Sequence, residues 1–253
     1  MRSAIVIPAR YASTRLRAKP LLRSTGKYLI QHVYERASKS RRSRLVLVAT
    51  DDPRIVAAVQ SFGGDAVLTR DDHLSGMDRV AEVARDLDVD VIINLQGDEP
   101  EIEPESLDML LELLERDTEA VMATLATPIT NREQWLDPNC VKVVFDDSGR
   151  ALYFSRAPIP QPRDGEPDFA DAAAPYWQHL GVYAYRRDFL LQLSSMPSGS
   201  LENLEKLEQL RVLSLGYRIC VGKVHAAEGG VDTLRDYEAF VRRFRQRGLA
   251  SAA

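Results

Sequence analysis

Val91-Ile92-Ile93-Asn94-Leu95 is a short apolar run that leads directly into the polar stretch Gln96-Gly97-Asp98-Glu99-Pro100. A run of this length without polar alternation is typical of a strand that is buried on both faces of a parallel sheet. The polar stretch would then follow the carboxyl end of the strand, where open α/β sheets bind their ligands. These ten residues therefore predict both a fold class and the edge of the sheet that carries the site.

The same pattern extends to both sides of this strand. We expect further strands over residues 4–7, 45–49, 66–68 and 120–125, and helices over 28–38, 53–62, 76–86 and 104–116. Strands that alternate with helices predict an α/β fold with a mostly parallel sheet and helices on both faces.

The pattern changes after about residue 128. Residues 141–145 and 151–155 resemble a hairpin, residues 158–175 a long mobile loop, and 179–185 and 219–221 strands; helices are expected over 187–194, 201–215 and 234–247. We therefore expect an α/β core made of residues 1–128 and 217–253, with a smaller β-rich lobe over 129–216.

Composition excludes several classes of protein. The 253 residues carry 33 Lys and Arg against 37 Asp and Glu, a net charge of −4, which argues against a dedicated nucleic-acid binder. No apolar run approaches the roughly 18 residues of a membrane span, and no signal-peptide core follows Met1. Cys140 and Cys220 show no metal-binding spacing. We expect a soluble cytoplasmic protein that binds neither nucleic acid nor membrane.

The charges are unevenly distributed along the chain. Residues 1–44 contain twelve Lys and Arg but one acid, Glu35, whereas the remainder has 21 bases and 36 acids. Such asymmetry marks either an anion site or a solvated basic helix face. The loop Pro8–Pro20, after the first strand, contains four of these cations and two hydroxyls where a nucleotide phosphate would lie. It is neither a GxxxxGK[ST] nor a GxGxxG motif, and a solvated basic turn is the alternative.

Two carboxylates are candidates for a metal site. Asp98 would face the basic loop, and one or two acids together with phosphates are the usual ligands of Mg²⁺. Asp232 follows Gly229-Gly230 and precedes the last helix. Either residue could instead be a turn residue or helix cap. A further acidic pair, in Asp88-Val89-Asp90, precedes its strand and is interpreted as a surface turn.

Glu208 is singled out by helical phase. In a continuous helix over 201–215 it lies within the apolar arc that contains Leu204, Val212 and Leu215. An acid on an inward face needs a partner or a function. An ion pair with Arg211 and a role in ligand binding are the two alternatives.

Several motifs together resemble the sugar-acid cytidylyltransferases, most specifically those that act on 3-deoxy-manno-octulosonate (Kdo). They occur in order over residues 3–240, and they are 8–16 with Lys19-Pro20-Leu21, 69–76, 96–100, 153–156, 179–183, 207–211 and 230–233. The resemblance implies a nucleotidyltransferase-like Rossmann-type fold, a homodimer with contacts in the 129–216 lobe, and the reaction of CTP with Kdo to give CMP-Kdo and pyrophosphate for lipopolysaccharide synthesis.

The resemblance also implies roles for individual residues. Nucleotide-binding positions are Pro8, Ala9, Arg10, Arg15, Lys19, Arg70, Ser75 and Gly76. Sugar-acid positions are Gln96, Arg156, His179, Tyr183, Glu208 and Gln209. Asp98 and Asp232 would bind Mg²⁺, and together with Lys19 they would form the catalytic set.

The chain departs from the family pattern at two places. Leu16-Arg17-Ala18-Lys19 stands where the family usually has Leu-Pro-Gly-Lys, and Met77 replaces the usual Thr after Ser-Gly. Loss of the glycine removes easy access to positive φ. The alternatives for function are a cytidylyltransferase for another sugar acid, such as amino-Kdo or a sialic acid, and a nucleotide-binding module without catalysis. The second predicts that a metal-binding acid is missing, yet both are present.

Overall fold

A computed structural model describes residues 1–12, 16–73, 75–171, 175–225 and 229–250, and the chain divides into two compact units. The parallel-sheet unit comprises Arg2–Asp108 and Glu228–Ala253, and the inserted unit comprises Met109–Ala227 with Met1. These limits differ from the expected ones at 128 and 217. The reason is that strand β5 (Ala120–Pro128) pairs with β8 (Trp177–Arg186) and β9 (Arg218–Lys223), and therefore belongs with them.

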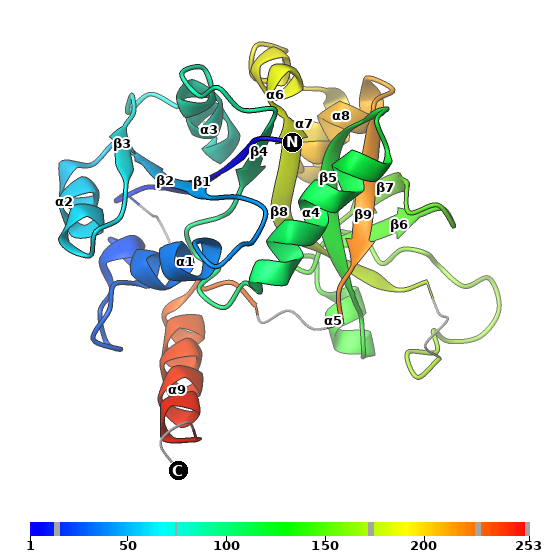
Figure 1. Ribbon diagram of the computed structural model, residues 1–253. Helices are drawn as coiled ribbons and strands as arrows, with labels where there is room; N and C mark the ends of the chain where they lie inside the picture. Colours follow the sequence, from blue (N-terminus) through cyan, green and yellow to red (C-terminus); the bar gives the residue numbers. More distant parts are fainter. Residues whose placement is uncertain (13–15, 74, 172–174, 226–228, 251–253) are drawn as a thin grey trace. The chain divides into compact units, whose positions relative to one another are not determined.

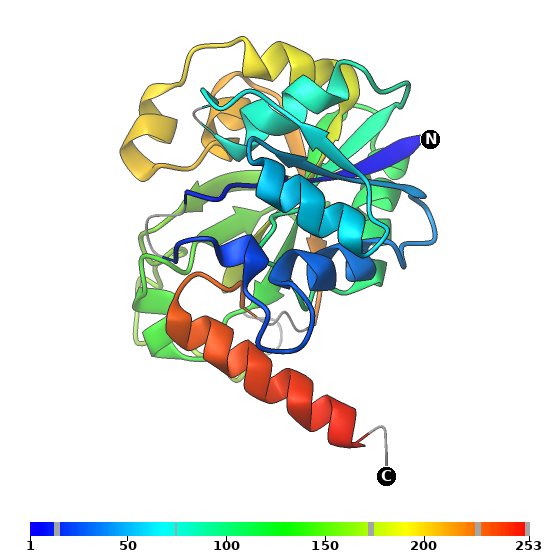
Figure 2. The same ribbon diagram turned by 90° about the vertical axis from the view of Figure 1, so that its left-hand side faces the viewer.

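The parallel-sheet unit has the predicted architecture. Its strands are parallel in the order β3-β2-β1-β4 and are β1 (Ser3–Ala9), β2 (Leu45–Thr50), β3 (Ala66–Leu68) and β4 (Val91–Asn94). Its other elements are a 3₁₀ turn η1 (Lys19–Leu21), α1 (Leu29–Ala37), α2 (Pro53–Ser61), α3 (Gly76–Ala84) and α9 (Leu234–Ala250). Figures 1 and 2 show α1 and α3 on opposite faces of these strands.

Local sequence explains these elements. Every residue of β1 and β4 is buried, as their apolar composition predicts. A capping box between Ser75 and Asp78 begins α3, and the Asp52 side chain accepts the Arg54 N–H at the start of α2. Helix α4 (Pro104–Arg116) begins in the parallel-sheet unit and continues into the inserted unit.

The inserted unit is rich in antiparallel strands. β5 runs antiparallel to β8 and parallel to β9, and β6 (Lys142–Phe145) forms the expected hairpin with β7 (Ala151–Ser155). The helices are α5 (Arg132–Leu136), α6 (Arg187–Ser194), α7 (Ser200–Glu205) and α8 (Gln209–Ser214). The short α5 was not expected from the sequence. A long loop was expected over residues 158–175. The described residues between β7 and β8 contain no helix or strand, and residues 172–174 are not among the described residues.

The prediction of one helix over 201–215 is wrong. The chain leaves the helical conformation at Lys206, whose φ is 55°, and restarts as α8. Leu204, which the continuous helix would bury, is 81% exposed. The Arg211 side chain is bound by Glu202, with Nε 2.7 Å from Oε2. The phase argument that turned Glu208 inward therefore fails, although Glu208 still lies at the start of α8.

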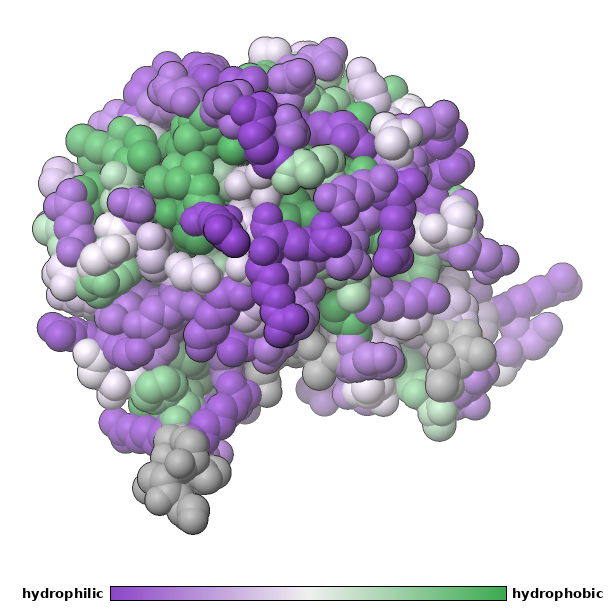
Figure 3. All heavy atoms as spheres, in the orientation of Figure 1, coloured by the Kyte–Doolittle hydropathy of each residue, from purple (hydrophilic) through white to green (hydrophobic). Residues whose placement is uncertain are grey.

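Most of the face shown in Figure 3 is hydrophilic, and apolar side chains gather on it near the elements that Figure 1 draws as β3 and α3. β3 is the edge strand of its unit, and its Val67 and Leu68 are exposed.

Within the part of the chain that the structure describes, no helix is both long and apolar enough to cross a membrane. Both cysteines are buried and free, as their apolar surroundings suggested.

Candidate active site

Three motifs that are far apart in sequence meet beyond the carboxyl ends of β1 and β4. The two strands are neighbours and parallel, so the loops after Ala9 and Asn94 leave the same edge. A Cβ built on Gly76 would lie 3.5 Å from Pro8 Cγ and 3.7 Å from Gln96 Oε1. The nucleotide motif and the Gln-Gly-Asp motif are thus adjacent, as the sheet-edge argument predicted, and the Ser-Gly motif, which only the family resemblance indicated, lies beside them.

Lys19 joins the two candidate metal-binding acids. Its Nζ donates to Asp98 Oδ2 at 2.6 Å, to the Val231 carbonyl at 2.8 Å and to Asp232 Oδ1 at 3.4 Å. The Lys19 side chain is 13% exposed. The whole predicted catalytic set therefore meets at one ammonium group.

Neither acid serves as a helix cap. The cap of α9 is formed by Thr233, whose Oγ1 accepts the Asp236 N–H at 3.2 Å while the Asp236 carboxylate accepts the Thr233 N–H at 2.8 Å. Asp98 lies well before α4, and its carbonyl accepts the Val231 N–H at 2.8 Å. The side chains of Asp98 and Asp232 are thereby directed to Lys19 rather than to a helix terminus.

The pair Asp88 and Asp90 has a structural partner instead. Both carboxylates form ion pairs with Arg2, which is 60% exposed. They lie before β4, at the opposite end of the strand from Asp98. The interpretation of Asp88-Val89-Asp90 as a surface turn is consistent with this position.

Gly230 allows the two acidic loops to pack closely. A Cβ at this position would lie 2.8 Å from Glu99 Oε1 and 3.4 Å from the Asp98 carbonyl. The pKa of Glu99 is raised to about 8, first by desolvation and then by the negative charges of Asp98 and Asp232. Glu99 is therefore mostly protonated at neutral pH.

The donor set fits Mg²⁺ held jointly by protein and phosphates. In the described residues there is no group of three or more His, Cys, Asp or Glu side chains arranged to enclose a metal. Two carboxylates and a main-chain carbonyl, all oxygen donors, meet at Lys19. Mg²⁺ is usually bound by one or two carboxylates with substrate phosphates completing the octahedron.

The other candidate nucleotide-binding residues differ in the partners of their side chains. Arg10 donates to the His73 carbonyl at 3.3 Å, so it lies against the segment that leads to Ser75. The Arg70 guanidinium is exposed and pairs with Asp72 at 2.8 Å. The Ser75 hydroxyl is engaged with the Asp78 carboxylate at 3.0 Å. Arg15 lies outside the described residues.

Ala18 adopts a left-handed backbone conformation, which glycine reaches more easily than alanine. Its φ of 55° and ψ of 26° are left-handed, and its N–H donates to the Tyr11 carbonyl at 3.0 Å. The chain therefore holds an alanine in a left-handed conformation, which is strained for a residue with a Cβ. Met77, the other departure, is buried in the parallel-sheet unit.

Replacing Ala18 with glycine is expected to stabilise the protein. Removing the Cβ relieves a left-handed strain of about 1 kcal/mol, which raises the melting temperature by about 2–4 °C in a chain of this size. Ala12→Gly, in the same loop without positive φ, is the matched control and should not stabilise. Equal melting temperatures for Ala18→Gly and Ala12→Gly would contradict the strain.

Four of the expected sugar-acid residues gather in the inserted unit. His179 Nε2 lies 3.0 Å from the Thr124 hydroxyl, and its ring is 5.4 Å from that of Tyr183. The Tyr183 hydroxyl donates to Gln209 Oε1 at 3.4 Å. Burial lowers the pKa of His179 to about 3, so its ring is neutral. Burial, and then the charge of Glu208, raises the pKa of Tyr183. The Tyr183 hydroxyl thus contacts an amide that is itself incompletely bonded.

Gln209 is that residue. It is 3% exposed, and its Nε2 has no hydrogen-bond partner within the described part of the protein. A buried amide donor without a partner is costly, and an oxygen of an ordered water or of a ligand would satisfy it. Arg156, in contrast, donates from Nε to the Glu205 carbonyl at 2.7 Å and from Nη1 to the Pro138 carbonyl at 2.9 Å, so part of its fork is used to fix the chain.

Lys142 is a buried residue that the sequence reasoning missed. It is fully buried, and its Nζ donates to the main-chain carbonyls of Asp137, Cys140 and Arg156 at 2.8, 2.6 and 2.8 Å. It therefore fixes the main chain at Arg156. The signal was a lysine inside the apolar run 141–145 of a lysine-poor chain.

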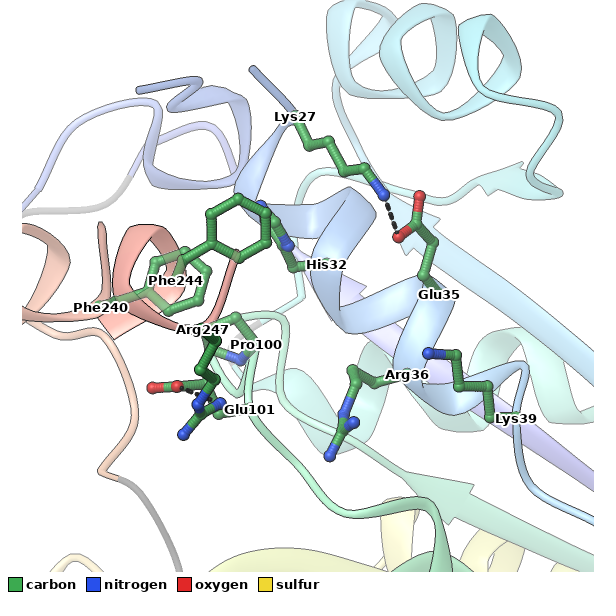
Figure 4. A pocket seen from close by; sticks show the side chains of 10 residues that line it. All are labelled: Lys27, His32, Glu35, Arg36, Lys39, Pro100, Glu101, Phe240, Phe244 and Arg247. Carbon is green, nitrogen blue, oxygen red and sulfur yellow. Dashed lines mark hydrogen bonds and ion pairs between the residues drawn. The ribbon is translucent and has the colours of Figure 1, made fainter. Parts of the chain in front are cut away.

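A cavity of about 360 Å³ lies between α1, the loop after β4 and α9 (Figure 4). Lys19, Asp98 and Asp232 are not among the residues that line it. The cavity has basic groups, yet Lys27 pairs with Glu35 at 2.6 Å and Arg247 with Glu101 at 2.9 Å. The Glu101 carboxylate, which also pairs with Arg243, is 6% exposed. The cavity wall thus ties α9 to the loop that carries Asp98.

The chain is similar to proteins of known activity over almost its full length. The model of the cytidylyltransferase family matches residues 4–219. A protein of Rhodopirellula baltica named 3-deoxy-manno-octulosonate cytidylyltransferase is 52% identical over 246 residues, which are 96% of this chain and 98% of that protein. One of the same name from Escherichia coli is 49% identical over 232 residues, 92% of each chain.

Solved structures give the same result. The structure of CMP:2-keto-3-deoxy-manno-octonic acid synthetase complexed with CTP superposes with a TM-score of 0.91 at 46% identity, over 98% of this chain and 100% of that one. A cytidylyltransferase from Leptospira borgpetersenii shares the fold, with a TM-score of 0.62 at 18% identity over 95% of this chain and 85% of that one. The sequence resemblance is confirmed: the chain belongs to the cytidylyltransferase family.

Proposed function

We propose that this protein transfers CMP from CTP to Kdo and releases pyrophosphate, supplying CMP-Kdo for lipopolysaccharide synthesis. The similarity to proteins named for this activity supports the proposal. The observation in the structure that carries it is the meeting of Lys19, Asp98 and Asp232 at the carboxyl edge of a parallel sheet. Both acids are present, which disfavours a module without catalysis.

The reaction needs positioning and charge neutralisation more than covalent catalysis. The anomeric oxygen of Kdo forms a bond to the α-phosphorus of CTP as the bond from that phosphorus to pyrophosphate breaks, and the hydroxyl proton leaves to solvent. Arg10 and Lys19 would neutralise the triphosphate in this step. We assign no general base.

We propose Asp98 and Asp232 as the ligands of Mg²⁺, supported by their all-oxygen surroundings and by their meeting at one cationic group. The ion would supply charge neutralisation at the phosphates and lower the pKa of the attacking hydroxyl. Asp98 and Asp232 hold their carboxylates toward one point because their loops are joined by the Val231–Asp98 hydrogen bond and the close approach at Gly230.

We propose that the inserted unit recognises the sugar acid through neutral hydrogen-bonding groups. The unpartnered Gln209 Nε2, together with His179 and Tyr183, suits hydroxyls and a carboxylate of a sugar acid. Glu208 and Arg156 complete this set, and Gln96 of the parallel-sheet unit is the remaining sugar-acid candidate. Arg70, Ser75 and Gly76 remain the candidates for the cytosine side.

Turnover with different acids separates Kdo from its closest alternatives. We expect CMP-sugar formation from CTP with Kdo, and much less with N-acetylneuraminic acid or amino-substituted Kdo. Turnover of either alternative acid in place of Kdo would overturn the choice of substrate while leaving the family unchanged.

Gln209→Leu tests the sugar-acid assignment. Removing the buried amide donor is expected to raise the KM for Kdo about tenfold and to leave the KM for CTP unchanged, since a lost hydrogen bond costs about 1–1.5 kcal/mol. Gln192→Leu, on an exposed face of α6, is the control. If both variants bind Kdo like the parent protein, Gln209 does not contact the sugar acid.

We also propose that the protein is a homodimer that acts in the cytoplasm, where CTP is available. Exposed leucines of the inserted unit support a self-contact there; they are Leu136, Leu152, Leu201, Leu204 and Leu215. Sedimentation equilibrium should give twice the mass of the chain, and a monomer would contradict the proposed homodimer.

Cell fractionation should recover the protein with soluble enzymes. Recovery in the membrane fraction would contradict the proposed location in the cytoplasm.

A further inference from the structure

The ammonium group of Lys19 is surrounded by oxygen atoms of the kind that bind a metal cation. An ammonium group has three N–H donors, and Lys19 has three oxygen partners, on Asp98, Val231 and Asp232. Two carboxylates and a carbonyl are also the donors that a hard divalent cation prefers. The ammonium therefore lies against the same oxygen atoms that are proposed to bind Mg²⁺.

The ammonium and a divalent cation exclude one another at these oxygens. Nζ is 2.6 Å from Asp98 Oδ2, whereas Mg²⁺ binds carboxylate oxygen at about 2.0–2.1 Å. Two cations at contact distance from one oxygen repel strongly, and the low exposure of the Lys19 side chain reduces screening by water. A metal that binds Asp98 through Oδ2 must therefore compete with Lys19 for that oxygen.

The displaced ammonium needs a new anion. Apart from the two acids, no described carboxylate lies within ion-pair distance of Lys19. A triphosphate would provide such an anion, because Lys19 follows Arg10 in the basic loop and its four-carbon stem allows the ammonium to move. Binding of the nucleotide would thus release the two acids to the metal.

We propose that Lys19 occupies the acid pair as an internal cation until the triphosphate arrives, so that a divalent metal binds tightly only together with the nucleotide. This inference rests on the proposed function for its nucleotide and metal. It adds an order of events. Without nucleotide, the protein binds the metal weakly because Lys19 occupies the two acids, and binding of CTP removes this competition. By linkage, the metal strengthens CTP binding by the same factor.

The test is titration of the full-length protein with Mn²⁺ alone, followed by electron paramagnetic resonance of the free ion. Lys19→Met keeps most of the length of the side chain but removes its charge. We expect it to bind Mn²⁺ at least about fivefold more tightly than the parent protein, within the usual range of coupling between sites. Lys39→Met, an exposed lysine of the same unit, should leave Mn²⁺ binding unchanged.

Further variants keep the test decisive. Lys19→Gln serves if Lys19→Met does not fold, as judged by circular dichroism and thermal melting. Adding Asp232→Asn to the lysine variant should abolish the gain in Mn²⁺ affinity. Equal or weaker Mn²⁺ binding by both folded lysine variants would overturn the proposal, because Lys19 would then be only a structural ion pair. No titration contains a sugar acid, so failure here is distinct from failure to form CMP-Kdo.

Discussion

Asp98→Asn is expected to lower kcat by at least about 10²–10³-fold while the protein stays folded. The substitution retains the shape of the side chain but removes the charge that would bind the metal and compensate the triphosphate at the reacting phosphorus, an electrostatic effect of the size seen when one such group is removed from an active site. The measurement is the steady-state rate of pyrophosphate release with CTP and Kdo, with circular dichroism as the test of folding.

Asp90→Asn is the matched control for this substitution. Asp90 lies at the other end of β4, is 48% exposed and pairs with Arg2. An exposed ion pair contributes about 0–1 kcal/mol, so this variant should retain near-normal activity. Unchanged turnover in Asp98→Asn would show that Asp98 does not bind the metal.

Gly230→Ala is expected to reduce both stability and turnover strongly. The added methyl group would lie 2.8 Å from Glu99 Oε1 and 3.4 Å from the Asp98 carbonyl. The buried Glu99 carboxylate must then shift, at a cost of about 1–3 kcal/mol for overpacking, and this disturbs the loop that carries Asp98. We expect a lower melting temperature and at least a tenfold loss of kcat/KM, since small misplacements of reacting groups are costly.

The neighbouring glycine provides the control. A Cβ on Gly229 meets no atom within 4 Å, so Gly229→Ala should change stability and turnover little. Similar behaviour of Gly229→Ala and Gly230→Ala would mean that the close approach of the two loops does not matter for the site.

The parallel-sheet unit was predictable because its elements carry strong local signals. Unbroken apolar runs gave β1 and β4, and the rule for sheet edges then placed Pro8, Gln96 and Asp98 near one another. Charge asymmetry was a weaker guide, because the basic residues of the first segment have different partners. Lys19 lies at the acid pair, whereas Lys27 forms an ordinary ion pair with Glu35.

The inserted unit was less predictable, because tertiary contacts decide its details. Lys206 breaks the helix expected over 201–215, a change that no glycine or proline at that position announces. The buried Lys142 finds its partners in main-chain carbonyls, which no residue pattern reveals. The site residues on this unit were suggested by the family resemblance, and the open amide of Gln209 became visible only in the folded chain.

The central claim is that the protein transfers the α-phosphoryl group of CTP, with its nucleoside, to the sugar acid. The direct measurement uses CTP labelled with ³²P at either the α or the γ position, together with Kdo, and separates the products. The proposed reaction places the α label in CMP-Kdo and the γ label in pyrophosphate. Appearance of the γ label in the sugar product, or release of free CMP without a nucleotide sugar, would contradict it.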